Sequence, residues 1–511
     1  MNATTGSLIT QRLGSISPDR LAGMRRGIEK ESLRTQPDGR LSTHPHPAAL
    51  GSALTHPHIT TDFSESQVEL VTGVHASGDD AIEELTRVHQ FVYRAIGDEM
   101  LWVGSMPCGL PSDNDIPIGR YGHSNVGQAK SVYRMGLAHR YGRRMQTISG
   151  IHYNWSMPGI DNDGYFGLIR NFRRHSFLLL VLFGASPAVC SSFVEGREHT
   201  LQTIKGHTLG LPHATSLRMG RLGYQSDAQA TLAVSYNSLQ RYGASLQQAL
   251  TQPHAAYEDI GIRAADGSYR QLSTALLQIE NEFYGTIRPK RVIQPGERPL
   301  HALRERGVEY VEVRCMDLDP FERVGINAST TRFIDMFLLH CLLSDSPPDD
   351  EAEIAELARN QDRAAMRGRE PGLLLERRGR EVPLVDWALE LLADMKSIAA
   401  MLDRASSSAR HSDALQQAER QLRGDAALPS AQVLQTMHEQ YDDSYVRFTL
   451  AQSAATRHAM LELPLSQAAE LELRHMAQAS LARQAELEAA PQPPFEQYRE
   501  QYLAPQRLSV P

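Results

Sequence analysis

The sequence predicts an α+β fold in which a largely antiparallel sheet is interrupted by long helices. Short runs rich in β-branched and aromatic residues recur between residues 21 and 345, with helix-like segments between them. Strands with long helical insertions are typical of α+β proteins. Apolar and polar residues alternate within these runs, and such alternation favours an antiparallel sheet with one open face. From about residue 346 onward the chain turns rich in Ala, Glu and Arg, which indicates helices.

Length and texture suggest three parts: an N-terminal segment (1–20), a mixed region (21–345) and a helical region packed on it (346–511). In the last part, residues 385–405 repeat apolar side chains at three- and four-residue spacing. Residues 465–490 are helical in pattern too, and the prolines that follow them are expected to end that helix.

The composition excludes several classes of protein. The 511 residues carry 52 Lys and Arg against 60 Asp and Glu, so the formal net charge is −8. This acidic balance argues against a protein that binds nucleic-acid backbones. The four cysteines are far apart and form no C-x-x-C motif, so we expect neither a disulfide framework nor a structural zinc knuckle. They are Cys108, Cys190, Cys315 and Cys341.

The most apolar run, Phe177 to Cys190, is too short to cross a bilayer and contains Gly184 and Pro187. We interpret it as a buried helix that ends near Gly184. The N-terminus has no apolar core of signal-peptide length. We therefore expect a cytoplasmic protein with no membrane partner.

Five strand candidates place polar side chains on one face, because residues two apart in a strand point the same way. The candidates are 27–34, 66–74, 148–158, 275–285 and 307–319. The polar sets are Glu29 with Glu31, His152 with Asn154, Gln278 with Glu280, Glu282 and Tyr284, and Tyr310 with Glu312 and Arg314; Asp62 and Glu69 flank the second candidate.

A face rich in carboxylates needs a compensating cation, because clustered carboxylates repel one another and raise one another's pKa values. Oxygen ligands with one imidazole suit Mg²⁺ or Mn²⁺, and Mg²⁺ usually comes with substrate phosphates. The sequence has neither a P-loop nor a dinucleotide-binding glycine motif. Arginines are then the expected phosphate ligands: Arg134, Arg288, Arg291 and Arg314. Any one of these pairs or arginines alone also fits a solvated surface.

Seven stretches, in order between about residues 23 and 345, resemble the proteobacterial type of glutamate–cysteine ligase. They are GIEKESLRTQPDGRLSTHPHPAALGSALTHPHITTDFSESQVELVT, SMPCGLPSDNDIPIGRYGHSNVG, YRMGLAHRYGRRMQTISGIHYNWSMP, LFGASPAVCSSF, PHATSLRMGRLGY, LQIENEFYGTIRPKR and GVEYVEVRCMDLDPFERVGI. The segment 195–213 resembles the family less closely. We therefore expect this chain to differ from the family in its fine specificity for the acceptor.

The resemblance implies a glutamine-synthetase-like fold, with a curved, mostly antiparallel sheet forming a funnel and helices outside. It also implies the first step of glutathione synthesis: ATP activates the γ-carboxylate of L-glutamate as an acyl phosphate, and the amine of L-cysteine displaces the phosphate. Relatives of this type often act as monomers and are commonly inhibited by glutathione.

Carried over residue by residue, the resemblance gives a site. Three Mg²⁺ ions would be held by Glu29, Glu31, Asp62, Glu69, His152 and Glu312. Arg314 would contact the transferring phosphoryl group and Arg134 the ATP phosphates. The glutamate head group would be held by Arg218, Gln146 and Asn154, and the cysteine pocket would be lined by Tyr133, Tyr224 and Tyr284. Lys30 and Ser32 are expected to face away from the metals.

Three other functions stay open at this point. The chain could join γ-glutamyl phosphate to another amine. It could be a guanidino-type phosphotransferase, since that kinase family shares the broad architecture. It could also be an inactive scaffold stabilised by metal, although a scaffold has no reason to keep six clustered charges.

Overall fold

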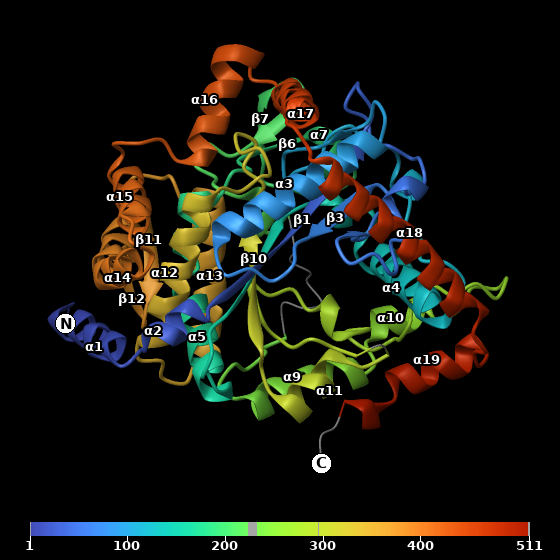
Figure 1. Ribbon diagram of the computed structural model, residues 1–511, viewed down its shortest axis with the longest axis horizontal. Helices are drawn as coiled ribbons and strands as arrows, with labels where there is room; N and C mark the ends of the chain where they lie inside the picture. Colours follow the sequence, from blue (N-terminus) through green and yellow to red (C-terminus); the bar gives the residue numbers. More distant parts are fainter. Residues whose placement is uncertain (1, 223–231, 295, 509–511) are drawn as a thin grey trace.

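The computed structural model of the chain describes residues 2–222, 232–294 and 296–508, and an antiparallel sheet lies at its centre (Figure 1). Six strands lie in the order β2-β3-β1-β5-β10-β9, and the short β4 pairs with the end of β1. They are β1 (Arg25–Thr35), β2 (Ile59–Thr61), β3 (Gln67–Val71), β4 (Met100–Leu101), β5 (Ile151–Ser156), β9 (Ile287–Lys290) and β10 (Tyr310–Met316). Every neighbouring pair is antiparallel. The predicted α+β fold with a mostly antiparallel sheet is confirmed.

The register of the sheet brings polar side chains from four strands onto one face. Three cross-strand pairs define it: Glu31 with Glu69, Glu29 with His152, and Asn154 with Glu312. Their neighbours along each strand point to the other face, because successive side chains alternate. That other face is apolar core, and it includes the fully buried Ile28, Val68, Tyr153 and Val311.

Helices cover the apolar face. Helices α3 (Gly78–Ala95), α5 (Asn162–His175) and α6 (Phe177–Phe183) pack on the strands, and α12 (Ala328–Leu343) packs on α3 and α5. Helix α6 is the apolar run of the sequence, and it ends at Gly184 as predicted. Of the helices that the structure describes, none combines the length and the apolar character that crossing a membrane requires.

The chain from residue 346 onward is mainly helical, as predicted. Its helices are α13 (Glu351–Arg367), α14 (Leu384–Ser406), α15 (Arg410–Arg423), α16 (Pro429–Tyr441), α17 (Tyr445–Glu462), α18 (Gln467–Ala489) and α19 (Phe495–Leu503). Helices α14 and α15 lie beside α12 on one flank, whereas α18 and α19 run along the opposite flank (Figure 1). The N-terminal helix α1 (Asn2–Gly14) packs against α14. The domain boundaries at residues 20 and 345 stay a prediction.

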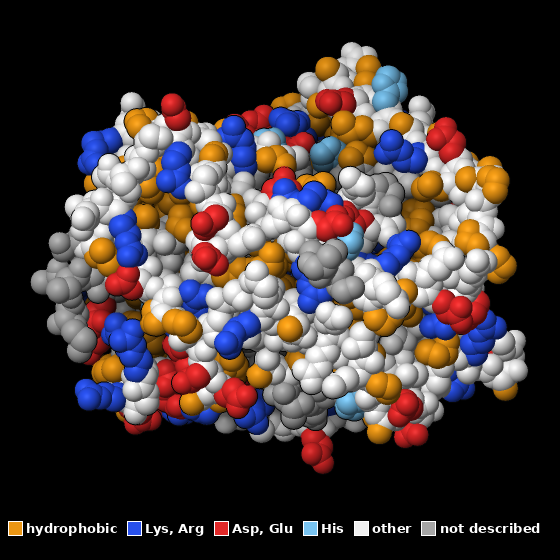
Figure 2. Space-filling model, turned by 90° about the horizontal axis from the view of Figure 1, so that it is seen from below, with side chains coloured by type: hydrophobic (Ala, Val, Ile, Leu, Met, Phe, Trp, Pro, Cys, Tyr) orange, Lys and Arg blue, Asp and Glu red, His pale blue; other side chains and the backbone are white. Residues whose placement is uncertain are grey.

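The surface carries charges of both signs. Figure 2 shows Lys and Arg side chains interspersed with Asp and Glu across one face of the molecule. Interspersed charges of this kind keep a protein soluble without creating a strong field of one sign.

One predicted strand is wrong. Residues 275–285 form no strand, and Glu280–Glu282 is a 3-10 turn, η5. Its two glutamates are held in buried ion pairs, Glu280 with Arg298 at 2.7 Å and Glu282 with Arg140 at 2.9 Å. These carboxylates therefore stabilise the local fold and do not join the polar face of the sheet.

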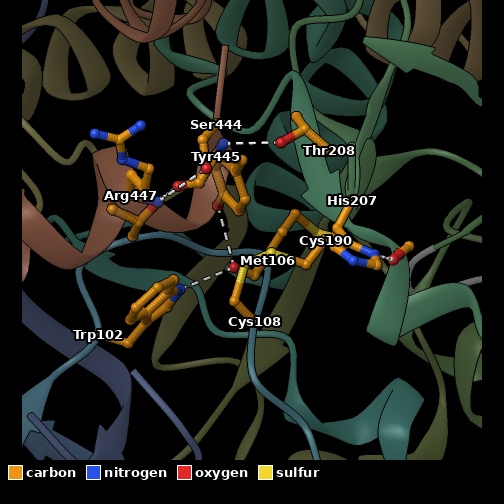
Figure 3. Close-up of a disulfide and its surroundings, with 11 residues drawn as sticks. Trp102, Met106, Cys108, Cys190, His207, Thr208, Ser444, Tyr445 and Arg447 are labelled. Atoms are coloured by element: carbon orange, nitrogen blue, oxygen red, sulfur yellow. Dashed lines mark hydrogen bonds between the residues drawn. A yellow bond between two sulfur atoms is a disulfide. The ribbon is translucent and has the colours of Figure 1, made fainter. Parts of the chain in front are cut away.

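The cysteine prediction is wrong for one pair. Cys108, which follows β4, forms a disulfide with Cys190, the last residue of β6 (Ala188–Cys190), and their Cα atoms are 5.3 Å apart (Figure 3). The two residues are 82 positions apart in the sequence, so spacing could not reveal the pairing. Beside the disulfide, the Tyr445 hydroxyl donates to the carbonyl of Met106 at 3.1 Å.

The less familiar segment 195–213 is partly folded into a small sheet with the same strand. Its strands β7 (Gln202–Lys205) and β8 (Thr208–Gly210) form a hairpin, and β8 pairs with β6. A second hairpin that the sequence did not reveal joins β11 (Leu374–Arg377) and β12 (Arg380–Pro383).

A buried ion pair ties the sheet to α12. Arg26 on β1 lies 2.6 Å from Asp335 on α12, and both side chains are at most 6% exposed. The Tyr153 hydroxyl of β5 donates to the same carboxylate at 2.9 Å. Asp335 thus fixes the two strands that carry Glu29 and His152.

We expect Asp335→Ala to lower the free energy of unfolding by about 3–5 kcal/mol, because it leaves the Arg26 guanidinium buried without its partner. Denaturant unfolding measures this loss. The exposed Glu83, paired with Arg87 on the surface of α3, is the control, and Glu83→Ala should change stability by no more than about 0.5 kcal/mol. A loss for Asp335→Ala as small as that of the control would contradict the anchoring role.

Candidate active site

Two overlapping groups of metal-ligand type lie on the polar face, and His152 belongs to both. The first contains Glu29, His152 and Glu312, and the second contains Glu31, Glu69 and His152; within each group one ligand atom per residue lies within 4.8 Å of the others. The imidazole lies at the centre of the sheet because β5 runs between β1 and β10.

In the first group, His152 Nδ1 is 3.0 Å from Glu29 and 3.9 Å from Glu312. Asn154 donates to Glu29 at 2.8 Å. On the far side, Lys290 and Arg314 each lie 3.0 Å from Glu312, which is 1% exposed. This half of the cluster therefore contains its own compensating cations.

The second group has less compensation. His152 Nε2 is 3.7 Å from Glu31, and this buried nitrogen has no hydrogen-bond partner among the described residues. The Gly150 amide donates to Glu31 at 2.8 Å. Asp62, which follows β2, faces the same two glutamates and contributes to raising their pKa values.

The pKa values divide the cluster into two halves. Burial, together with Asp62, raises the pKa of Glu31 to about 8. Burial, Asp62 and Glu29 also raise the pKa of Glu69 well above its usual range. Burial pushes the pKa of Glu312 upward too, but Lys290 and Arg314 outweigh it and hold that pKa well below its usual range. The half around Glu31 and Glu69 therefore has too little positive charge to offset burial and repulsion.

These residues fit divalent magnesium. The donors are carboxylate oxygens plus one imidazole, which is the set that a hard cation takes. An unpartnered nitrogen on His152 and two carboxyl groups with raised pKa values are the features that a bound cation would satisfy. Lys30 and Ser32 point away from this face, as predicted, and bond to each other at 2.9 Å.

The predicted arginines surround the cluster but are held differently. Arg314 on β10 also approaches His152 to 3.5 Å. Arg218, in the 3-10 turn η4 (Leu217–Met219), donates to the carbonyl of Arg314 at 2.8 Å and lies 3.7 Å from Asp317. Arg134 on α4 (Asn125–Tyr141) donates to the carbonyl of Asp62 and packs on Tyr121.

Three of the predicted substrate side chains, Gln146, Tyr133 and Tyr284, lie near one another. The Gln146 amide in η3 (Arg144–Thr147) donates to the Tyr284 hydroxyl at 2.9 Å. Tyr133 lies close enough for Tyr284 to contribute to raising its pKa, after burial and Glu282. Tyr224 lies outside the described residues.

A cavity of about 300 Å³ adjoins Tyr284. Arg173, Arg218 and Arg314 contribute to its wall, together with Tyr284 and apolar residues of α13, and no described wall residue is acidic. Three guanidinium groups on a wall without a carboxylate suit the cavity to an anionic ligand. Each of them also pairs with a carboxylate outside the wall: Arg173 with Asp349, Arg218 with Asp317 and Arg314 with Glu312.

Two lysines of the site were missed by sequence reasoning. Lys290 contacts Glu312, and Lys130 on α4 moderates the raised pKa of Glu69. The pattern could have revealed both. Lys290 is two residues from the candidate Arg288 on one strand, and Lys130 is four residues from Arg134 on one helix, so each shares a face with a candidate. Arg291, by contrast, bonds backbone carbonyls away from the cluster.

Comparisons with known proteins agree with this geometry. The family model described as glutamate-cysteine ligase matches residues 13–161 and 158–364. A glutamate–cysteine ligase from Alcanivorax borkumensis is 47% identical over 94% of this chain and 96% of its own, and one from Pseudomonas putida is 48% identical over 90% and 91%. The chain belongs to the glutamate–cysteine ligase family. The predicted family and the enzyme class, a ligase, are thereby confirmed.

Solved structures extend this result to three dimensions. The crystal structure of a glutamate–cysteine ligase from Francisella tularensis in complex with AMP matches with a TM-score of 0.89 and 36% identity, covering 94% of this ligase chain and 97% of its own. A bifunctional glutathione synthetase from Pasteurella multocida shares the fold, with a TM-score of 0.71 and 22% identity over 93% of this chain and 58% of its own.

The raised pKa of Glu31 predicts a pH dependence for the metal-free ligase. A carboxyl group whose folded pKa lies above its unfolded value adds stability at low pH and loses it as pH rises. In chelator, the stability of wild type relative to Glu31→Gln should therefore fall between pH 4.5 and about 8, by on the order of 5 kcal/mol. Unfolding at several pH values tests this; a pH-independent difference would contradict the raised pKa, and saturating Mg²⁺ should reduce the slope.

Glu69→Gln tests the second group from the metal side. In chelator this variant should melt at or above the wild-type temperature, because one repelling charge is gone. The stabilisation by Mg²⁺ should shrink, and turnover should fall about 100-fold or more. Thermal melts with and without Mg²⁺ measure the first two effects. Glu83→Gln, at a position that is 71% exposed on α3, is the control. If Mg²⁺ raised the melting temperature of Glu69→Gln as much as that of wild type, Glu69 would be excluded as a ligand.

Proposed function

We propose that this chain joins the γ-carboxylate of L-glutamate to the amine of L-cysteine at the expense of ATP, through γ-glutamyl phosphate. The observation that carries the proposal is the row of five side chains of metal-ligand type across β3, β1, β5 and β10, with Asp62 after β2, and with Arg314 and the arginine-lined cavity beside them. A carboxylate and a triphosphate repel each other, so a site that brings them together must supply positive charge.

The six predicted ligands would hold Mg²⁺. The family resemblance implies three ions, and Mn²⁺ would be able to replace Mg²⁺. When bound, the metal neutralises the phosphates and orients them for in-line transfer. The ligand assignment rests on the geometry above: Glu29, His152 and Glu312 form one set, and Glu31, Glu69 and His152 the other. Asp62 joins the second set through its influence on the two glutamates.

The cationic side chains of the chain would stabilise charge during phosphoryl transfer. Arg314 already spans Glu312 and His152, so its planar fork is fixed beside the place where the γ-phosphate would lie. Lys290 shares Glu312 with Arg314. If a metal ion were bound to Glu312, the side chains of Lys290 and Arg314 would be able to turn toward the phosphate. Arg134, held on the carbonyl of Asp62, would contact the phosphates from the other edge of the sheet.

The remaining side chains would bind the amino acids. Arg218 lines the cavity and is oriented by Asp317 and the carbonyl of Arg314, which suits it to the α-carboxylate of glutamate. Asn154 and Gln146 would complete that subsite. Tyr133, Tyr224 and Tyr284 would surround cysteine, since a tyrosine offers a hydroxyl to a carboxylate and a ring to a small thiol side chain.

The reaction then balances in two steps. An oxygen of the glutamate γ-carboxylate attacks the γ-phosphorus of ATP and the bond to ADP breaks, giving the acyl phosphate. The cysteine amine attacks the acyl carbon, the new C–N bond forms, and phosphate leaves with that oxygen. The amine loses one proton. The products are γ-glutamylcysteine, ADP and phosphate.

Three finer points belong to the same proposal. The enzyme would act in the cytoplasm, as a monomer, and glutathione would inhibit it by occupying the substrate cavity. Sedimentation tests the oligomeric state, and inhibition competitive with glutamate tests the effect of glutathione.

ADP release with glutamate, ATP and Mg²⁺ tests the reaction, with L-cysteine or L-2-aminobutyrate as the acceptor and mass detection of the dipeptide. We expect turnover that depends on the acceptor. Turnover with a different amine alone would place the error in the acceptor pocket. Folded protein that is silent with every acceptor would contradict the ligase assignment. Glutamate labelled with ¹⁸O in its γ-carboxylate should yield phosphate that carries the label; unlabelled phosphate would exclude the acyl phosphate.

Arg314→Lys should lower kcat by about 100-fold and leave the KM for ATP within a few-fold of wild type, because lysine keeps the charge but loses the two-pronged fork. Steady-state kinetics separates the two parameters. Arg291→Lys, close by on the chain but bonded to backbone carbonyls, should change neither. An equal loss in kcat and in ATP affinity would indicate that Arg314 is structural.

A further inference from the structure

A further group of potential metal ligands lies on the opposite side of the sheet from the carboxylates. His175 ends α5, and His340 and Cys341 are adjacent on α12; one ligand atom from each lies within 4.8 Å of the others. Helix α12 is on the apolar side, because its Asp335 bonds the core-facing Tyr153. The group is therefore separate from the site described above.

The two imidazoles in this group, one half-buried and one buried, are incompletely bonded. The Nδ1 atoms of His175 and His340 are both buried, and neither has a hydrogen-bond partner among the described residues. The side chain of His340 is 2% exposed. An unpaired polar atom inside a protein has a free-energy cost, and a bound ligand would remove it. The neighbouring Cys341 is a free, fully buried thiol.

The surroundings orient the His340 ring for coordination. Its Nε2 atom faces the carboxylate of Asp394 on α14 at 3.8 Å and the hydroxyl of Ser344 at 3.5 Å. A metal-bound histidine commonly turns its second nitrogen to a carboxylate, which fixes the tautomer. The Nδ1 atom of His340 is then the nitrogen left for a ligand.

The charges around the group permit a divalent cation. Arg174 on α5 is paired with Glu353 at 2.7 Å, and Arg377 on β11 is paired with Glu390 at 2.7 Å. Both guanidinium groups are thus paired with their own carboxylates, and Arg378 is a third cation that contributes to lowering the pKa of His175. A cysteine thiolate and Asp394 together would balance the two positive charges of the ion.

We propose that His175, His340 and Cys341 bind one Zn²⁺ ion, or a cation of the same borderline-soft class, at the junction of α5, α12 and α14. Two imidazoles and one thiolate are ligands that zinc prefers and magnesium does not. Binding forms the metal–sulfur bond and releases the thiol proton. In a tetrahedral site the ligand atoms would be roughly 3.5 Å apart, and atoms that lie within 4.8 Å of one another would have to converge by at most about 1.3 Å. A water would be the fourth ligand.

The consequence would be structural. The metal would join α5 to α12, whose Asp335 holds Arg26 and Tyr153, and through Asp394 it would reach α14. This inference does not depend on the proposed reaction.

Co²⁺ is the probe, because a cobalt–thiolate bond gives a charge-transfer absorption that carboxylate and imidazole ligands do not. The full-length protein is freed of metal, kept non-reducing so that Cys108 and Cys190 stay joined, and held in excess Mg²⁺. We expect one equivalent of Co²⁺ to give the thiolate band, Zn²⁺ to abolish it by displacement, and Zn²⁺ to raise the melting temperature.

Matched variants assign the band. Cys341→Ser should lose it, whereas Cys315→Ser, which removes the other free and buried cysteine, should keep it. His175→Gln, at the half-buried position, should weaken Co²⁺ binding at least tenfold. This variant tests the proposal even if Cys341→Ser does not fold. The absence of a thiolate band in folded wild type, or a band that survives in folded Cys341→Ser and at wild-type affinity in His175→Gln, would overturn the proposal.

Discussion

The physical constraint on which this structure depends is the repulsion among carboxylates gathered on one face of a sheet. Antiparallel register places Glu69 opposite Glu31 and His152 opposite Glu29, so the spacing of the charges is fixed by backbone hydrogen bonds. The protein offsets the charge more fully on one side, where Lys290 and Arg314 meet Glu312. The other side keeps glutamates with raised pKa values. That imbalance is what a divalent cation would correct.

The rest of the fold holds this face rigid. The opposite face is packed with apolar side chains, and helices α3, α5, α6 and α12 cover it. The buried pair of Arg26 and Asp335 joins β1 to α12, and Tyr153 adds β5 to the same carboxylate. A buried ion pair is weak evidence for stability, but a broken one is costly. Here the ion pair fixes the positions of β1 and β5, the strands that carry Glu29 and His152.

Much of the site could be predicted because strand alternation is a local rule. Glu29 and Glu31, or His152 and Asn154, share a face wherever their strand pairs, so the sequence alone defines the face. The same rule failed at Gln278–Tyr284. There Glu280 and Glu282 are held by Arg298 and Arg140, which are distant enough in sequence to be invisible to a local pattern. A polar alternation was therefore mistaken for a strand.

The disulfide was missed for a related reason. Cys108 and Cys190 are brought together by the approach of the segment after β4 to β6, and no spacing rule describes that approach. The signal for Lys290 was present in the sequence, since it lies two residues from Arg288 on the same strand and so shares its face. Long-range partners in ion pairs and disulfides could be identified only from the structure. The polar face of the sheet could be predicted from the sequence alone.

Anomalous X-ray scattering from crystals of the ligase grown with Mn²⁺ tests the central claim most directly. Manganese takes the same oxygen-rich sites as magnesium and its anomalous signal locates each ion. We expect ions within coordination distance of Glu31, Glu69 and His152, and of Glu29 and Glu312. Manganese bound elsewhere, with these side chains still paired only to one another, would contradict the account.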